Sequence, residues 1–224
     1  MLIKDCIGDM IISVKGNTPL LDCKKLLRKH KISQLPVVDD SNSLIGILSK
    51  IDITAVIPNS GTGQDFIETM EELGHMTADQ AMVKNPKTIN VHDTVEHAAV
   101  LMEDFSIRCL PVLDDSEKLV GIITDWDIFR IFVNITGAKA KGYHIHFLLE
   151  NKLGTLRAKL DIFREYKAQI VTILSAINED EGTRNVTIRF KPTDPSLVKQ
   201  LIEVLCADNK AIYWGVGDDL HILK

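Results

Sequence analysis

Apolar and polar positions follow the same order in two consecutive stretches of the chain. A short β-rich run (residues 11–14 or 88–91) precedes a segment whose apolar residues recur three or four positions apart (20–30 or 95–105), which predicts an amphipathic helix. Two apolar runs separated by an acidic turn then predict a pair of strands, and a second helix begins after them. The pattern therefore predicts two successive β-α-β-β-α units.

The two units are copies of one sequence at a constant offset of 75 residues. The run Leu-Pro-Val-Val-Asp-Asp at 35–40 returns as Leu-Pro-Val-Leu-Asp-Asp at 110–115. The similarity is densest between 32–53 and 107–128, where 12 of 22 aligned pairs are identical. A repeated unit that cannot bury its apolar face alone packs against its copy. We therefore expect the copies to face each other across a cleft with paired sites.

The rest of the chain has a different pattern of apolar and polar positions, which predicts four strands and two helices. The strands are expected at 143–149, 170–177, 186–190 and 211–216, and the helices at 155–167 and 196–207. This βαββαβ order is the ferredoxin-like arrangement, so the fold class is α/β (α+β) throughout. The expected division is a first repeat at 1–58, an inter-repeat linker at 59–75 with a short helix at 66–73, a second repeat at 76–136, a linker at 137–142, and a last domain at 143–224.

Charge and cysteine content exclude several functional classes. The formal net charge is −5, and the acidic excess lies in residues 1–137, which argues against a nucleic-acid partner. The four cysteines form no CxxC pair, so neither a disulfide framework nor a zinc site is expected, and no other metal site is predicted. With no signal-peptide pattern and no run of about 18 apolar residues, we expect a cytoplasmic protein without a membrane partner. No P-loop, GxGxxG, HExxH or Ser-His-Asp pattern occurs, so no enzymatic activity is expected.

Each copy carries the motif Gly-x-x-[Ser/Thr]-x-x-Asp at the point where a strand gives way to a helix. The motif residues are Ser49 and Asp52 in the first copy, and Thr124 and Asp127 in the second. One interpretation is structural, because the hydroxyl can cap the helix and the carboxylate can complete a capping box. The other is binding, because a helix start with a hydroxyl binds phosphate and a carboxylate accepts from ribose hydroxyls. The recurrence of the motif favours binding.

These residues resemble the CBS domain, and the tandem over about 1–136 resembles a CBS pair, or Bateman module. The resemblance implies a pseudo-twofold module with two clefts for an adenine nucleotide (AMP, ADP or ATP) or another adenosyl ligand such as NAD or S-adenosylmethionine. It implies that Ser49 and Thr124 meet phosphate and that Asp52 and Asp127 hold the ribose. It further implies that the residues just before Leu-Pro face the cleft, namely Ser33, Gln34, Arg108 and Cys109. The backbone near Val14 and Ile89 would flank the adenine.

The two expected sites differ in charge at one position. The first motif contains Lys50, which attracts a phosphate, and the second contains Asp125, which repels one. Arg108 is placed to offset Asp125 or to serve a phosphate that reaches across from the first motif. The sequence therefore predicts unequal sites.

The last domain resembles an ACT domain, a small amino-acid-sensing unit. The supporting loop is Leu-Glu-Asn-Lys-Leu-Gly-Thr-Leu at 149–156, in which Leu153 stands where that family has proline. The resemblance implies an amino-acid ligand at Asn151, Gly154 and Thr155, and the alternative is a scaffold that only dimerises.

The order CBS–CBS–ACT resembles the acetoin-utilisation protein B (AcuB) family. The resemblance implies a homodimeric, non-enzymatic regulator of an unidentified protein partner in acetoin or carbon metabolism. The alternative function is a ligand-free scaffold for dimerisation and interaction.

Overall fold

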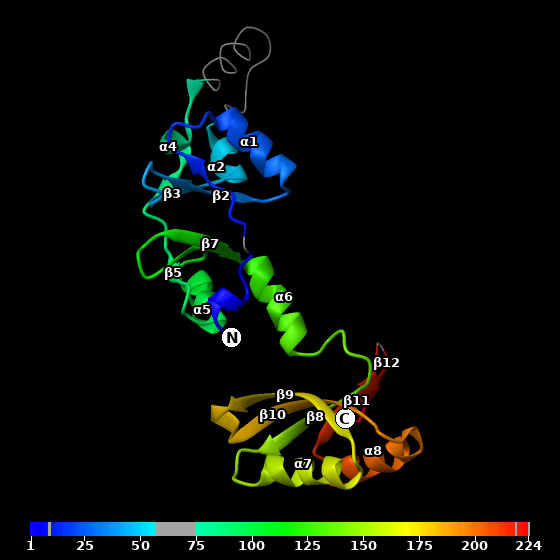
Figure 1. Cartoon of the computed structure of the whole chain (residues 1–224). Coiled ribbons are helices and arrows are strands. Elements are labelled where there is room, and N and C mark those ends of the chain that lie inside the picture. Colours follow the sequence, from blue (N-terminus) through cyan, green and yellow to red (C-terminus); the bar gives the residue numbers. More distant parts are fainter. Residues whose placement is uncertain (9, 57–74, 218, 224) are drawn as a thin grey trace. The chain divides into compact units, whose positions relative to one another are not determined.

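The computed structural model describes residues 1–8, 10–56, 75–217 and 219–223 (Figure 1). The helix expected at 66–73 and nearly all of the linker expected at 59–75 lie outside these residues. The chain divides into two compact units, Met1–Ile128 and Phe129–Lys224. Within the described ranges, every helix is too short or too polar to cross a membrane.

The first unit contains both copies of the repeat as far as Ile128, which lies within the last helix, and each copy has the predicted β-α-β-β-α order. Before and within the first copy the elements are η1 (Ile3–Asp5), β1 (Val14–Lys15), α1 (Leu20–Lys29), β2 (Gln34–Val38), β3 (Leu44–Ser49) and α2 (Lys50–Ala55). Before and within the second copy they are α4 (Ala78–Ala81), β4 (Val83–Lys84), β5 (Ile89–Asn90), α5 (Val95–Asp104), β6 (Cys109–Leu113), β7 (Leu119–Thr124) and α6 (Asp125–Ile135).

The apolar pattern of the sequence fixes which face of each helix is buried. In α1, Leu20, Cys23 and Leu27 are fully buried, three or four positions apart, and they pack in a core with strand residues such as Leu35 and Leu48. The equivalent positions of α5 are also buried. The first helix of each copy therefore buries the same three positions.

The segment that precedes each copy packs against the other copy. The backbone N–H of Ile3 donates to the carbonyl of Asp93 at 2.9 Å, and the N–H of Ala78, 75 positions later, donates to the carbonyl of Thr18 at 2.9 Å. Leu2 likewise forms an isolated antiparallel bridge with Thr94. The copies are interleaved in space, although they follow one another along the chain.

The two sheets of this unit share a pattern but differ in one strand. In each, a parallel pair (β1–β2 or β5–β6) is followed by an antiparallel pair (β2–β3 or β6–β7). The first sheet gains β4 as a fourth strand, since Gly46 pairs with Lys84. The second sheet has three strands among the described residues. A strand was predicted at 11–14, but β1 begins only at Val14 and ends at Lys15.

Two glycines allow the interleaved segments to approach the strands closely. A Cβ atom on Gly121 of β7 would lie 2.8 Å from Cδ1 of Ile7, and one on Gly46 of β3 would collide with the Met82 side chain. These glycines stand at the same position of the two copies. Their role in the motif is therefore to admit the segment that precedes the other copy.

The second unit has the predicted βαββαβ order. Its elements from the first strand on are β8 (Tyr143–Glu150), α7 (Thr155–Glu165), β9 (Gln169–Asn178), η2 (Glu179–Glu181), β10 (Thr183–Lys191), η3 (Pro195–Leu197), α8 (Val198–Cys206), β11 (Ala211–Val216) and β12 (Asp219–Ile222). The sheet order is β12-β11-β8-β10-β9, with every neighbouring pair antiparallel. Strand β12 was not predicted. Helices α7 and α8 lie on one face of the sheet (Figure 1), over a core that includes Phe147, Phe163 and Phe190.

Candidate ligand-binding site

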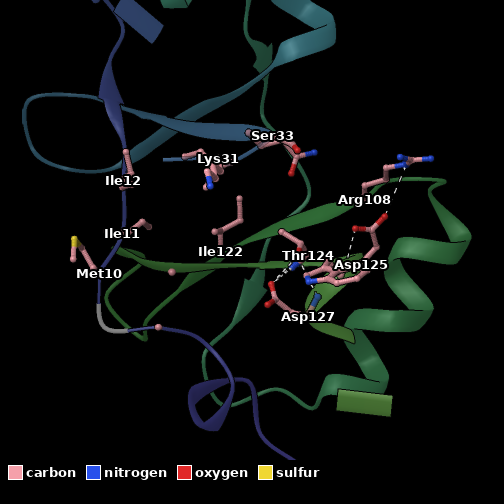
Figure 2. Close-up of a pocket in the computed structure, with 15 residues that line it drawn as sticks. Met10, Ile11, Ile12, Lys31, Ser33, Arg108, Ile122, Thr124, Asp125 and Asp127 are labelled. Carbon is pink, nitrogen blue, oxygen red and sulfur yellow. Dashed lines mark hydrogen bonds and ion pairs between the residues drawn. The ribbon is translucent and has the colours of Figure 1, made fainter. Parts of the chain in front are cut away.

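A cavity of about 470 Å³ lies within the first unit, between the two copies. Four separate segments line it, and Figure 2 shows their side chains. The lining residues are Gly8, Met10, Ile11, Ile12, Lys31, Ile32, Ser33, Gln34, Arg108, Gly121, Ile122, Thr124, Asp125, Trp126 and Asp127. A volume of this size is in the range of small-molecule sites.

Thr124 and Asp127 form the polar end of the cavity, where β7 ends and α6 begins. The hydroxyl of Thr124 donates to Oδ2 of Asp127 at 2.7 Å, and the backbone N–H of Thr124 donates to the same oxygen at 3.0 Å. The N–H of Asp127 donates to the Thr124 hydroxyl at 3.3 Å. These bonds form the predicted capping box and hold the carboxylate in one orientation at the cavity wall.

Three more predicted residues line the cavity. Ser33 and Gln34 reach it from the start of β2, and Arg108 reaches it from the residue before β6. The N–H of Asp125 donates to the carbonyl of Arg108 at 2.9 Å, which connects the two polar sides of the second copy.

The corresponding residues of the first motif lie outside this cavity. The backbone N–H of Ser49 donates to Oδ2 of Asp52 at 2.7 Å, and the N–H of Asp52 donates back to the Ser49 hydroxyl at 3.2 Å. Lys50 donates through its backbone N–H to the carbonyl of Ser33 at 3.2 Å. The first motif thus forms the same capping box as the second, away from the cavity.

Three other predicted residues are also outside the cavity, and all are buried. Val14 and Ile89 are 6% and 4% exposed, and each belongs to the first strand of its sheet. Cys109 is 7% exposed, and burial, with a smaller contribution from Asp125, raises the pKa of its thiol to about 12. Cys109 is therefore a neutral core residue.

Residues 10–12 form an apolar wall of the cavity beside the second motif. Residues 10–12 are not part of a strand and stand beside β7 as one wall of the cavity (Figure 2). They supply apolar side chains opposite Thr124 and Asp127.

The charges around the cavity are mixed. Arg108 and Asp125 form an exposed ion pair with 3.9 Å between Nε and Oδ2, and Lys31 adds a second cation. Lys31 was not among the predicted residues. It takes the left-handed backbone conformation (φ 55°) directly after α1, as does Ser106 at the equivalent position (φ 51°). Because Lys31 and Ser106 are 75 positions apart, the constant offset of the repeat was the signal that both residues belong to the same turn.

The residues expected to bind an amino acid lie together at the start of α7. Gly154 has φ 91° and precedes the helix, and Asn151 lies in the loop before it. The hydroxyl of Thr155 donates to the carbonyls of Glu150 and Lys152, both at 2.9 Å. In the described part of the chain, no three His, Cys, Asp or Glu side chains gather where they could hold a metal ion.

Comparison with known proteins identifies the family. Residues 3–59 and 78–134, about half of the chain, match the CBS domain. This chain belongs to the CBS domain family. The two matches correspond to the two copies of the repeat.

Curated relatives match this CBS chain over somewhat more than half of its length. It is 32% identical over 131 residues to the L-aspartate semialdehyde sulfurtransferase of Methanocaldococcus jannaschii, covering 58% of this chain and 23% of that protein. It is 31% identical over 140 residues to the chloroplastic CBS domain-containing protein CBSX2 of Arabidopsis thaliana. This match covers 54% of this chain and 58% of CBSX2. The match therefore spans only about a quarter of the archaeal enzyme.

Solved CBS pairs are similar in structure, and two of them contain adenosyl ligands. The CBS domain pair of protein MJ0100, in complex with 5′-methylthioadenosine and S-adenosyl-L-methionine, is 30% identical with a TM-score of 0.50, covering 60% of this chain and 97% of its own. CBSX2 in complex with AMP is 27% identical with a TM-score of 0.51, and the match covers 60% of this chain and 97% of the CBSX2 chain. The AcuB structure from Vibrio cholerae shares the fold at 24% identity and a TM-score of 0.52. The match covers 62% of this chain and 95% of the AcuB chain.

Proposed function

We propose that this chain is a non-enzymatic regulatory sensor that binds an adenosyl ligand in the cavity beside Thr124 and Asp127. The observation that carries the proposal is the oriented Asp127 carboxylate at the wall of a cavity of about 470 Å³. A carboxylate held in this way is suited to accept hydrogen bonds from the two hydroxyls of a ribose.

The remaining lining residues divide the cavity into an apolar and a charged part. Ile11, Ile12 and Ile122 supply the apolar surface on which an adenine ring packs. Lys31 and Arg108 provide the cations for the part of the ligand attached to the 5′ carbon. AMP and S-adenosyl-L-methionine in the similar CBS pairs support this class of ligand.

Regulation requires that the ligand favour one conformation of the chain over another. The cavity is lined from both copies, so a ligand that contacts Ser33 and Thr124 at once stabilises one arrangement of the copies. In this proposal the regulated partner is a separate metabolic protein, and the AcuB resemblance supports a partner in acetoin or carbon metabolism. An amino acid at Asn151 and Gly154 would be a second input, on the ACT resemblance alone.

One observation favours the alternative, a ligand-free scaffold. The capping boxes of Ser49–Asp52 and Thr124–Asp127 are complete without any ligand. A scaffold would retain these residues to start its helices and would bind its partner regardless of nucleotide.

Isothermal titration of the full chain with AMP, ADP, ATP, NAD and S-adenosylmethionine tests the proposal. We expect saturable binding of at least one of the five at one site per chain. Absence of heat for all five at about 1 mM ligand, a concentration that detects weak binding, would contradict adenosyl sensing. A circular dichroism spectrum recorded on the same sample establishes that the protein is folded.

A further inference from the structure

The charged side chains that line the cavity are of both signs. Among the described lining residues, Lys31 and Arg108 are the cations, and Asp125 and Asp127 are the carboxylates. These four charges sum to zero, so they offer a phosphate chain no net positive charge. A ligand that carries a positive and a negative group can pair with both signs at once.

Asp125 has a fixed carboxylate with an exchangeable partner. The backbone N–H of Trp126 donates to Oδ1 of Asp125 at 2.7 Å, which holds the carboxylate at the start of α6. Its Oδ2 lies 3.9 Å from Nε of Arg108, and Figure 2 shows the two side chains directed toward each other. Their side chains are 56% and 85% exposed, and such exposed pairs are weakly held. A cation of the ligand can therefore replace Arg108 beside Asp125.

Trp126, the next residue, is a second feature that favours a cation. It lines the cavity and is 67% exposed. The face of an indole attracts cations more strongly than the other aromatic side chains do. Asp125 and Asp127 flank it in the first turn of α6, so these groups lie together at one end of the cavity.

Helix capping does not explain residues 125 and 126. The first copy has Lys50 and Ile51 at the equivalent positions, and its helix begins with the same capping box as the second. The carboxylate of Asp125 and the indole of Trp126 therefore belong to one copy, which is the copy whose motif lines the cavity.

We propose that the cavity selects an adenosyl ligand whose 5′ substituent is a sulfonium with an amino-acid chain, over nucleotides with phosphate at that position. This inference rests on the proposed function, in which Asp127 holds the ribose. The indole of Trp126 contacts the sulfonium, Asp125 accepts hydrogen bonds from the ammonium, and Lys31 pairs with the carboxylate. S-Adenosylmethionine carries all three groups, whereas the 5′ substituent of AMP is only negative.

Isothermal titration of the full chain with four probes tests this selectivity. S-Adenosylmethionine is compared with S-adenosylhomocysteine, which lacks the sulfonium charge, with 5′-methylthioadenosine, which lacks the amino-acid chain as well, and with AMP. We expect S-adenosylmethionine to bind about tenfold more tightly than 5′-methylthioadenosine or AMP, since it gains a cation–π contact and a charged hydrogen bond.

Two variants assign the selectivity to its residues. Asp125→Asn should weaken binding of S-adenosylmethionine and S-adenosylhomocysteine about fivefold, strengthen that of AMP a few-fold, and leave that of 5′-methylthioadenosine unchanged. Trp126→Ile installs the residue of the first copy and should abolish the preference for S-adenosylmethionine over S-adenosylhomocysteine. The control Glu103→Gln removes an exposed carboxylate of the same copy outside the cavity and should leave all four affinities unchanged.

The outcomes separate this inference from the proposed function. Tighter binding of AMP than of S-adenosylmethionine by the wild type would overturn the selectivity and leave adenosyl sensing intact. Equal losses of S-adenosylmethionine and 5′-methylthioadenosine affinity in Asp125→Asn would also overturn it, because the residue would then act on the shape of the cavity. Binding of none of the four probes by protein that circular dichroism shows to be folded would contradict the proposed function itself.

Discussion

Ser43 and Lys118 pair in an isolated antiparallel bridge, and they occupy the same position of the two copies. The Lys118 ammonium also donates to the Ser43 hydroxyl at 2.9 Å. A residue can meet its own equivalent only near the axis that relates the copies, so this bridge marks the local pseudo-twofold axis. The same axis relates Asp52 to Asp127, which makes each motif a matched control for the other.

Asp127→Ala should weaken adenosyl binding in the cavity about 10- to 100-fold, because a charged acceptor for the ribose is lost. Asp52→Ala removes the same capping carboxylate at a position outside the cavity and should leave that affinity unchanged. Isothermal titration of both variants measures the difference. Equal losses in the two variants would show that the carboxylates act through helix capping.

Asp125→Asn should raise the affinity for ADP and ATP a few-fold, because it removes a carboxylate near the cations that face a phosphate. Adenosine carries no phosphate and should bind Asp125→Asn and the wild type equally. Arg108→Ala should change phosphate affinity in the opposite direction. If adenosine and ATP respond alike to Asp125→Asn, the residue acts on the shape of the cavity and its charge is not responsible.

Lys159→Ala should destabilise the second unit by about 2–4 kcal/mol. Lys159 is 5% exposed, and its ammonium donates to the carbonyl of Leu205 at 3.0 Å and to Asp208 at 2.9 Å, which connects α7 to the end of α8. Truncation removes these bonds and leaves a void. Lys159→Met keeps most of the volume and should cost less. Urea unfolding followed by Trp214 fluorescence in a W126F background measures both.

The second unit should lose stability as the pH falls below neutrality, through His144. Burial, and secondarily the charge of Arg189, lowers the pKa of His144 below its ordinary value of 6.5. The unfolded chain therefore takes up the proton first, so the stabilisation is present above pH 6.5 and is lost as the pH falls through the folded-state pKa. Among the residues that the structure describes, Nδ1 of His144 is buried and has no hydrogen-bond partner, which agrees with this direction.

His144→Asn should reduce this pH dependence between about pH 7 and pH 5, relative to the wild type. The measurement is the urea midpoint across that range in the W126F background. His92→Asn is the control, because His92 is an exposed histidine of the first unit. A midpoint that varies with pH equally in the wild type and in His144→Asn would contradict the assignment.

Local sequence was sufficient to predict the elements. The spacing of Leu20, Cys23 and Leu27 predicts both the helix and its buried face, because a helix places such residues on one side. The capping box was one of the two interpretations of each motif, because Ser49 and Asp52, like Thr124 and Asp127, need only be three residues apart. The constant offset predicts that the copies pair, and Ser43–Lys118 confirms this at the axis.

The sequence by itself determined the duplication, the helices with their caps, and the polar motif. Only the tertiary structure decided that the segment before each copy completes the other copy, and that β4 joins the first sheet as a fourth strand. It also placed the cavity beside Asp127 and added Lys31 to its wall. Capping and amphipathic spacing act within a few residues, whereas strand pairing and cavity shape depend on segments far apart along the chain, between which local sequence carries no distance information.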